Sequence, residues 1–257
     1  GFSFEVVHKL KDIKSPDLIM TITGRYFLFA KIKHPFVKTI YWAQGLSAEE
    51  AKWNLHGISS YLRYIFRRFS EPVSVNCCDI LFVVSERMIR YFGDVYNYHL
   101  DKKNYIVMPC YNLKLSEYFD INQYKTPTFV YAGNSSVWQG VDFMLDVYAL
   151  IESKLPDAKL IIYSKDKLVF EDKLKERGIS NFEIKYVPVT ELQKELHKYK
   201  YGFILRDNHI VNQVSTPTKM NSYLSNYLIP IFSDTVDDFK RHVKLGEFTI
   251  MANYPLE

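Results

Sequence analysis

Two basic side chains in the second half of the chain have the type and spacing needed to bind an anion. Arg206 comes directly after the apolar run 201–205, which is typical of a strand. In a parallel α/β sheet, ligands bind at the carboxyl ends of the strands, where Arg206 would lie. Thr216 as N-cap and Pro217 at the first position predict a helix with Lys219 in its first turn. A cation is disfavoured there, so a diphosphate would explain both basic residues, although Lys219 could simply point into solvent.

A second candidate is the turn at residues 133–140, which reads GNSSVWQG and follows the apolar run 128–132. Glycines and small residues let the backbone approach a ligand closely, and the next helix is expected to begin near Gly140. An ordinary strand-to-helix loop has the same composition, so the turn on its own does not decide between a binding site and a connection.

A repeating order of short apolar run, turn and helical stretch supplies the scaffold for these residues. The runs are rich in Val, Ile, Phe and Tyr and are apolar on both faces, which predicts parallel sheets covered by helices. The fold class is therefore α/β, with two Rossmann-like doubly wound domains. Helix starts are predicted from capping boxes at Ser47 with Glu50 and at Thr190 with Gln193. The predicted strands are 17–21, 37–41, 79–84, 104–108, 128–132, 159–163, 182–187, 201–205 and 228–232, with a weak strand near 248–250.

The predicted domains are residues 1–123 and residues 124–257, joined by an aperiodic connection at 112–126. Only about four strands fall in the first half, fewer than a complete Rossmann-like domain usually has. We therefore expect the first domain to be incomplete, with residue 1 lying inside it. We also expect closing helices to be missing after the last weak strand, near residues 254–257.

Composition limits the classes of function. The net charge of +4 is mildly basic, which permits an anionic ligand but is too small for a typical nucleic-acid binder. No apolar run approaches the roughly 18 residues of a membrane-spanning helix. Cys77, Cys78 and Cys110 lack disulfide or zinc spacing and are interpreted as buried thiols in a reducing compartment. These features predict a soluble, cytoplasmic protein.

One stretch, residues 53–69, interleaves Tyr61, Tyr64, Ile65 and Phe69 with three arginines. Such a helix can lie on an anionic membrane as a peripheral contact, close to a lipid-linked acceptor. It can equally pack its aromatic residues on the first sheet and leave the arginines in water. The second interpretation is favoured, because the sheet needs helices to cover it.

Several segments, in their order along the chain, resemble family-four retaining glycosyltransferases of the GT-B fold, bacterial type. YAGNSSVWQGVDFMLDVYALI with LPDAKLIIYSKD is similar to the start of the family's second domain, and LRDNHIVNQVSTPTKMNSYLSNYLIPIFSD resembles its later nucleotide-sugar region. YWAQGLSAEE and CDILFVVSERM resemble first-domain segments. The resemblance covers about residues 16–234. It implies a cytoplasmic, metal-independent transferase of polysaccharide biosynthesis that uses a nucleotide sugar as substrate and needs no cofactor.

The resemblance also implies roles for individual residues. Arg206 and Lys219 match the family's later basic pair and would be the catalytic residues, stabilising the departing diphosphate. The residues implied to bind the donor are Gly133, Asn134, Ser135, Gln139, Asn212, Thr218 and Ser222.

Four positions depart from the family pattern. Asn134 and Gln139 stand where the family commonly has Arg and Lys. Ser222 replaces a Glu that binds the donor, and Tyr227 replaces a Gly. No metal site is expected, because no Asp-x-Asp motif is present and the histidines lack ligand spacing.

The predicted function is transfer of a sugar from a nucleoside-diphosphate sugar to a glycan or lipid-linked acceptor. The second domain would hold the donor and the first the acceptor. Asn134, Gln139 and Ser222 leave open a non-catalytic protein of the same fold that binds sugar nucleotides or glycans or serves as a scaffold. A nicotinamide-dependent oxidoreductase is disfavoured, because no Gly-x-Gly-x-x-Gly follows any predicted strand.

Overall fold

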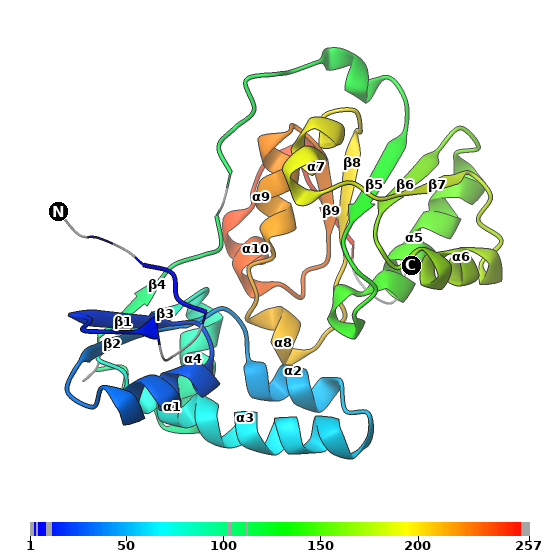
Figure 1. Ribbon diagram of the computed structural model, residues 1–257. Coiled ribbons are helices and arrows are strands. Elements are labelled where there is room, and N and C mark those ends of the chain that lie inside the picture. The colour runs from blue at the N-terminus through cyan, green and yellow to red at the C-terminus, as the bar shows by residue number, and fades with distance from the viewer. Residues whose placement is uncertain (1–2, 4, 9–11, 102–103, 112, 253–257) are drawn as a thin grey trace. The chain divides into compact units, whose positions relative to one another are not determined.

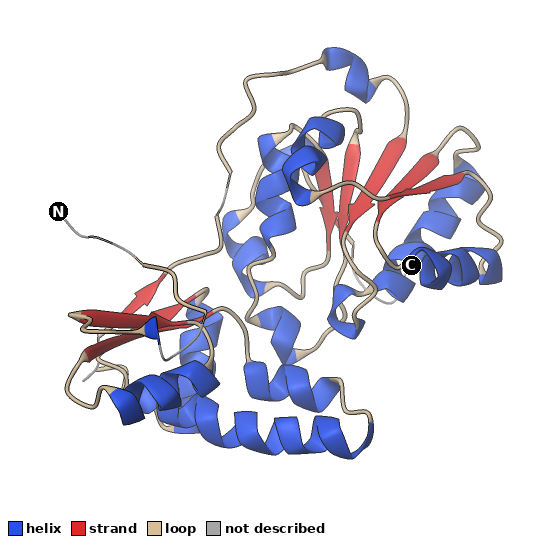
Figure 2. Cartoon of the chain, in the orientation of Figure 1, coloured by secondary structure: helices blue, strands red, loops and turns tan. Residues whose placement is uncertain are grey.

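The computed structural model describes residue 3 and residues 5–8, 12–101, 104–111 and 113–252, and the chain divides after Pro109 into two compact units (Figures 1 and 2). The junction predicted from the sequence lies at 123/124, but the described part of the connection packs on the second unit. The amide of Ser116 donates to the carbonyl of Ser225 at 2.7 Å, and the Tyr124 hydroxyl donates to the Tyr227 carbonyl at 2.6 Å. Residues 253–257, where closing helices were expected to be missing, lie outside the described residues.

The first unit is a parallel sheet whose described strands follow one another in the order β1-β2-β3-β4. Consecutive order with right-handed crossovers places the connecting helices on one face of the sheet. The elements of this unit are β1 (Leu18–Thr21), α1 (Gly24–Lys33), β2 (Lys38–Ala43), α2 (Ser47–Trp53), α3 (Gly57–Cys77), β3 (Ile80–Val83), α4 (Glu86–Tyr96) and β4 (Tyr105–Val107).

Alternation along β1 and β3 separates a buried face from a partly exposed one, whereas β2 has three consecutive buried residues, Thr39 to Tyr41. Ile19 in β1 and Leu81 in β3 are buried, whereas Leu18, Met20 and Ile106 are exposed. The expected two-sided burial therefore holds in β2 but not in β1. The core of this sheet lies on the helical side.

Helix α3 corrects the interpretation favoured for residues 53–69. Tyr61, Ile65 and Phe69 do not pack on the sheet, since each is exposed. The inward side of the helix carries polar residues instead. Arg67 donates from Nη1 to the Ser47 carbonyl at 3.3 Å, and Ser74 donates to the Ser70 carbonyl at 2.7 Å.

A buried carboxylate, Glu71, joins α3 to the start of α2. Its oxygens accept hydrogen bonds from the amides of Ser47 (2.6 Å) and Ala48 (3.3 Å) and from the Tyr96 hydroxyl (2.6 Å). Burial raises its pKa, although these donors act in the opposite direction. The capping box predicted at Ser47 is therefore wrong: no side chain of α2 caps this helix, and Glu71 satisfies its first amides from outside.

Glu71→Ala should lower the free energy of unfolding by about 1–3 kcal/mol, because two helix amides and a phenol lose a buried acceptor. Urea titration followed by circular dichroism measures the change. Asp94→Ala on the exposed side of α4 is the control and should stay within about 0.5 kcal/mol of the parent. Equal values for the two variants would show that the Glu71 contacts do not contribute.

The second unit is a doubly wound parallel sheet in the order β10-β9-β8-β5-β6-β7. Parallel pairing of β5 with β6 and β8, and of β8 with β9, confirms the predicted core of the sheet. Its strands are β5 (Thr128–Ala132), β6 (Lys159–Tyr163), β7 (Phe182–Lys185), β8 (Tyr201–Ile204), β9 (Ile229–Phe232) and β10 (Ile250–Met251). Its helices are α5 (Val141–Lys154), α6 (Lys167–Glu176), α7 (Val189–Leu196), α8 (Ile210–Gln213), α9 (Thr218–Ser225) and α10 (Asp237–His242), with single 3₁₀ turns at Ile121–Tyr124, Val137–Gln139 and Gly246–Phe248.

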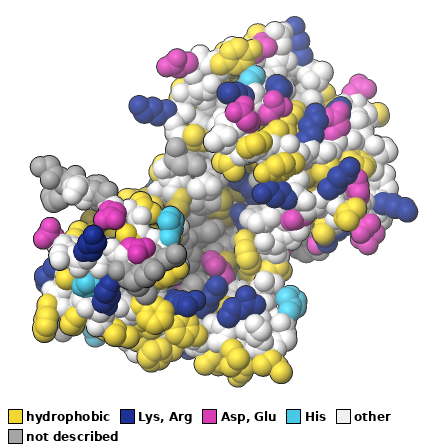
Figure 3. Space-filling model, viewed as in Figure 1, with side chains coloured by type: hydrophobic (Ala, Val, Ile, Leu, Met, Phe, Trp, Pro, Cys, Tyr) yellow, Lys and Arg dark blue, Asp and Glu magenta, His cyan; other side chains and the backbone are white. Residues whose placement is uncertain are grey.

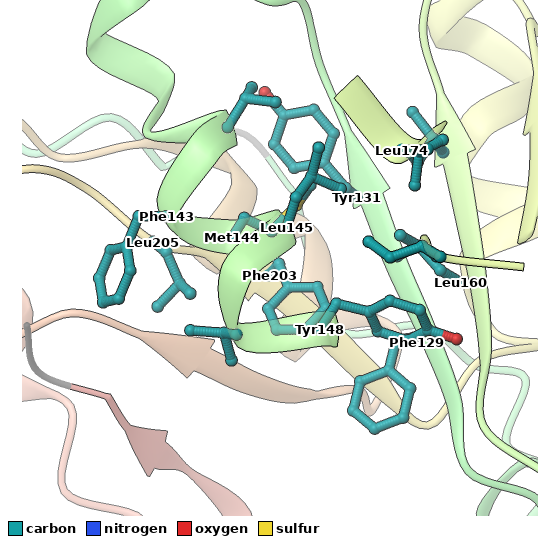
Figure 4. Packing of buried hydrophobic residues seen from close by; sticks show 14 of the residues in the cluster. Phe129, Tyr131, Phe143, Met144, Leu145, Tyr148, Leu160, Leu174, Phe203 and Leu205 are labelled. Atoms are coloured by element: carbon teal, nitrogen blue, oxygen red, sulfur yellow. The ribbon is translucent and has the colours of Figure 1, made fainter. Parts of the chain in front are cut away.

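Both faces of this sheet are buried, as the two-sided apolar runs predicted. In β5, Phe129 and Tyr131 pack with Tyr148 of α5, while Val130 and Ala132 pack on the other face with Tyr223 of α9. Figure 4 shows the first cluster, in which α5 lies over the strands. Two packed faces hold the carboxyl ends of β5, β6, β8 and β9 in fixed register, and the candidate site lies there.

Several local expectations differ from the structure. Helix α9 begins at Thr218 with Pro217 as N-cap, and the Thr216 hydroxyl instead accepts a hydrogen bond from the Cys110 amide at 3.2 Å. Helix α7 likewise begins at Val189 after Pro188, so Thr190 does not cap it. None of the three cysteines, all of which the structure describes, forms a disulfide, and Cys77 is exposed while the other two are half-buried rather than fully buried. Among the described residues, no helix is long and apolar enough to cross a membrane.

Candidate functional site

Three chain segments meet at the carboxyl edge of the second sheet. They are the loop 133–140 after β5, the residues after β8 beginning with Arg206, and the first turn of α9 with Lys219. The loop was predicted to begin a helix near Gly140, and α5 does begin at Val141. The N-cap position of α5 is Gly140, which has no side chain to cap the helix, and the positive end of the helix dipole lies at this loop.

Gly140 determines how closely the loop approaches the end of β8. Its φ of 60° is left-handed, and a Cβ atom at this position would lie 2.6 Å from the Leu205 carbonyl oxygen. Both conditions exclude a side chain. The glycine therefore brings the loop backbone against the residues that carry Arg206.

Gly140→Ala should destabilise the protein more than Gly178→Ala, which serves as the matched control. Gly178 has a similar φ of 66° but no atom within 4 Å of its Cβ position. Gly178→Ala should lower the free energy of unfolding by about 1–2 kcal/mol, the cost of a left-handed backbone at a residue with a side chain. Gly140→Ala should lower it by a further ~1–3 kcal/mol, because the new methyl group also meets the Leu205 carbonyl. Chemical denaturation measures both. Equal losses would mean that the contact with Leu205 relaxes freely.

Arg206 is a buried cation, 7% exposed, in direct contact with this loop. Its Nη1 donates to the carbonyl of Trp138, and its backbone exchanges two hydrogen bonds with the Ser233 hydroxyl, at 2.9 and 3.0 Å. Burial lowers the pKa of the guanidinium to about 10, so the group stays charged at neutral pH.

Lys219 reaches the same loop from α9. Its amine lies 2.5 Å from Oε1 of Gln139 and 4.4 Å from the centre of the Tyr131 ring. A Cβ atom on Gly133 would lie 2.7 Å from this amine, so the glycine provides the space that the lysine occupies. Desolvation around the amine, and then the charge of Arg206, hold the pKa of Lys219 well below its ordinary value.

Arg206 and Lys219 therefore form a cluster of like charge, as the sequence placed them. Among the described residues, neither cation forms a salt bridge; the Lys219 amine is bound by a neutral amide and an aromatic ring. Two cations in a poorly solvated place repel each other and lack their hydration. A bound dianion would relieve both effects, which makes this cluster the best candidate for an anion site.

Asn134 and Ser135 are held by contacts within the loop region. Oδ1 of Asn134 accepts from the Ser136 amide at 3.1 Å, and the amide and hydroxyl of Ser135 both donate to Oδ2 of Asp166, at 2.7 and 2.8 Å. These donors lower the pKa of Asp166. Asp166 follows β6 and was missed by the sequence analysis, because an aspartate after a strand has no distinctive spacing.

The remaining predicted ligand-binding residues lie after β8 or on α9. Asn212 is buried, and its Nδ2 donates to the Asp207 carbonyl at 3.0 Å, so this side chain closes its own loop. Thr218 is exposed at the start of α9, and Ser222 is half-buried one turn beyond Lys219. The structure thus brings Gly133, Gln139 and Lys219 together, and directs the Asn212 amide elsewhere.

Tyr227 explains one departure from the family pattern. Its φ of 62° is left-handed, a conformation that glycine adopts easily and tyrosine does not. The side chain packs on the Phe119 ring, 4.8 Å between ring centres, and its hydroxyl donates to the Ser116 carbonyl at 2.9 Å. The tyrosine therefore anchors the connecting segment on the second unit.

No group of three or more His, Cys, Asp or Glu side chains with metal-binding geometry occurs in the part of the chain that the structure describes.

Solved glycosyltransferase structures share this architecture. WaaG, a glycosyltransferase involved in lipopolysaccharide biosynthesis, matches with a TM-score of 0.65 and 13% identity over 91% of this chain. The pneumococcal O-GlcNAc transferase GtfA, solved with UDP and GlcNAc, matches with a TM-score of 0.67 and 11% identity over 92%. Sucrose-phosphate synthase from Thermosynechococcus elongatus matches with a TM-score of 0.67 and 13% identity over 92%. The chain has the GT-B fold.

The GT-B fold is shown here by structure and not by sequence similarity. No protein-family model and no curated protein sequence matches the chain. The chain spans 69% of the WaaG chain, 45% of the GtfA chain and 60% of the sucrose-phosphate synthase chain. Within the GT-B fold, the second unit is the doubly wound sheet whose carboxyl edge carries Arg206 and Lys219.

Proposed function

We propose that the chain binds a nucleoside-diphosphate sugar in its second unit and transfers the sugar to a glycan or lipid-linked acceptor on the first. The observation that carries this proposal is the contact of both Arg206 and Lys219 with the loop 133–140 at the carboxyl edge of a doubly wound sheet. UDP in the GtfA structure supports a nucleotide donor. Retention of configuration rests on the family resemblance alone.

The chemical task of the cluster is electrostatic. When the bond between sugar and diphosphate breaks, negative charge grows on the departing phosphate oxygens. Arg206 is pre-oriented by Trp138 and Ser233, and Lys219 by Gln139 and Tyr131, so little reorganisation is needed at that moment. The start of α5 lies at the same loop and adds the positive end of a helix dipole. Because these groups supply the neutralisation, the proposal assigns no metal or cofactor.

A non-catalytic binding or scaffold role is the second candidate, and two residues favour it. Gln139 gives the loop a neutral amide where the family has a lysine, and this amide already binds the Lys219 amine. Ser222 offers only a neutral, weak hydrogen-bond acceptor to the hydroxyl groups of the sugar nucleotide. Both departures reduce transition-state stabilisation more than they prevent binding.

A screen of UDP-, GDP-, ADP- and dTDP-sugars tests the two candidates. A true ligand at 100 times its dissociation constant should add about 2.7 kcal/mol to the free energy of unfolding, seen as a thermal shift. Release of the nucleoside diphosphate then separates a transferase from a binding protein. No shift with any of the four donors would count against the transferase and against a sugar-nucleotide-binding protein, and would leave the scaffold role.

At a pH above the folded pKa of Lys219, donor binding should take up a proton. In the unfolded chain Lys219 has the ordinary lysine pKa of 10.5, and in the folded protein the pKa is well below this value. Between the two values the unfolded chain holds more protons, so the contribution of this group to the free energy of unfolding rises as pH rises through that range and falls as pH falls through it. A bound diphosphate favours the charged amine, so affinity should fall as pH rises through the folded pKa. Nucleotide sugars suit the test because their diphosphate has no group titrating near neutral pH.

Calorimetry in two buffers of different ionisation enthalpy measures this uptake. Lys219→Met should abolish it, and the surface variant Lys194→Met should not. A proton uptake that persists in Lys219→Met would assign it to another group.

The location of the protein is also a proposal. Three free cysteines fit a reducing compartment, and we place the protein in the cytoplasm.

A further inference from the structure

Helix α3 carries its apolar side chains outward. They recur at the spacing of one helical face, and their exposed fractions run from 41% for Phe66 to 82% for Ile58. A helix of a soluble domain normally turns this face to the core, but α3 packs through polar side chains such as Ser60, Arg67 and Glu71. The outward residues are Ile58, Tyr61, Leu62, Ile65, Phe66 and Phe69.

Helix α1 continues this exposed surface. Tyr26, Phe29 and Ile32 are also exposed, the last at 78%. Tyr26 and Phe29 of α1 line one pocket together with Leu62 and Phe66 of α3, so the two rows are neighbours. We call these exposed apolar residues of α1 and α3, with the arginines among them, the α1–α3 face.

The charge of the α1–α3 face is positive. Neither helix contains an acidic residue except Glu71, which is fully buried. The basic residues of the two helices are Arg25, Lys31, Lys33, Arg63, Arg67 and Arg68, of which Lys31 is paired with Asp79. Figure 3 shows hydrophobic side chains gathered over α1 and α3 with lysines and arginines beside them.

The pocket between the helices has a volume of about 810 Å³. Arg25, Arg63 and Arg67 line it, and Glu50 is the acidic residue among its lining. Burial raises the pKa of Glu50 and the Arg67 charge opposes that shift. The pocket therefore places cationic groups directly beside an apolar surface. An anionic lipid layer presents the complementary groups, with phosphate headgroups next to acyl chains.

We propose that the α1–α3 face binds the surface of an anionic lipid bilayer, with the apolar residues of α3 at the acyl boundary and a phosphate headgroup among the arginines of the pocket. An apolar helical face flanked by arginines is the pattern of helices that lie in the membrane interface. A protein partner would have to match the same positive charge with acidic groups. The proposal is independent of transferase activity, because it concerns binding alone.

Sedimentation of the full chain with vesicles tests the apolar part. Wild type should bind vesicles of phosphatidylcholine with phosphatidylglycerol, and the uncharged double variant Ile65→Gln, Phe69→Gln should bind at least about tenfold more weakly. Leu168→Gln, Val169→Gln on α6 is the matched control, because those residues are 75% and 43% exposed and lie in the second unit. Circular dichroism confirms that all variants are folded. An equal loss of vesicle binding in the α6 control, or no loss of binding in the α3 variant, overturns the proposal.

The charged part has its own test. Binding to vesicles of phosphatidylcholine alone should be much weaker, and Arg63→Gln should reduce binding to anionic vesicles about fivefold, as expected for one arginine near such a surface. Soluble glycerol phosphate should compete only weakly, because it lacks the apolar contact. Full competition by glycerol phosphate would identify a free phosphate ester as the ligand, and would overturn the bilayer proposal. A dimer in light scattering that binds no vesicles would overturn it too, by showing that a second copy covers the face.

Discussion

Replacing Lys219 with methionine should weaken binding of a nucleoside-diphosphate sugar by roughly 10- to 150-fold. This corresponds to about 1.5–3 kcal/mol for one charge-assisted hydrogen bond to a phosphate. Methionine keeps an unbranched apolar chain one atom shorter than lysine beside the Tyr131 ring, so the loss reports mainly the charge and not the packing. Calorimetric titration with the donor found in the screen measures the effect.

The same variant separates a functional from a structural lysine by a second measurement. The amine is a poorly solvated cation near Arg206, so its removal should leave the free energy of unfolding without ligand unchanged or raised. A structural lysine would give the opposite result. Lys194→Met, which removes an exposed lysine paired with Glu191, is the control and should change neither quantity. Donor affinity within twofold of wild type in Lys219→Met would remove the lysine from the site.

Arg206 is less suited to this test, although the resemblance pairs it with Lys219. Its backbone is fixed by Ser233 and its guanidinium bonds the Trp138 carbonyl, so a variant would lose loop structure along with charge. Part of its role is to position the loop 133–140 for whatever binds there.

The strands could be predicted from the sequence because their signal is local. A short run with apolar residues on both faces, such as 128–132, has few alternatives in an α/β protein, and the observed strand ends differ from the predicted ones by at most two residues. The proximity of Arg206 and Lys219 followed from the same logic. Residues that follow parallel strands meet at one edge of a sheet.

Features that depend on distant partners could not be predicted. The amides at Ser47 are bound by Glu71, which lies far along the chain, so the local Ser-x-x-Glu pattern was misleading. Periodicity in α3 correctly indicated one apolar face, but a period does not say whether that face meets a core or solvent. Asp166 could not be predicted for a similar reason, since its hydrogen bond with Ser135 forms only once β5 and β6 are paired.

Ser222→Glu should tighten donor binding about 5- to 30-fold if the second unit holds the donor as proposed. A carboxylate accepts hydrogen bonds from sugar or ribose hydroxyls about twice as strongly as a neutral acceptor, which corresponds to about 1–2 kcal/mol. Position 222 lies three residues after Lys219 on α9, so both side chains point to one side of the helix. Tyr227 does not interfere by itself, because its ring is held against Phe119.

The matched control for this variant is Ser222→Gln, which adds the same length without the charge. A carboxylate at this position could instead pair with the Lys219 amine and block the diphosphate, in which case Ser222→Glu would bind donor more weakly while Ser222→Gln would not. Tighter binding in Ser222→Glu alone places residue 222 at the donor hydroxyls. A rise in turnover with that tighter binding favours a transferase limited by one missing carboxylate, whereas tighter binding without turnover favours the non-catalytic alternative. Equal affinities in both variants and wild type would mean that position 222 does not face the donor.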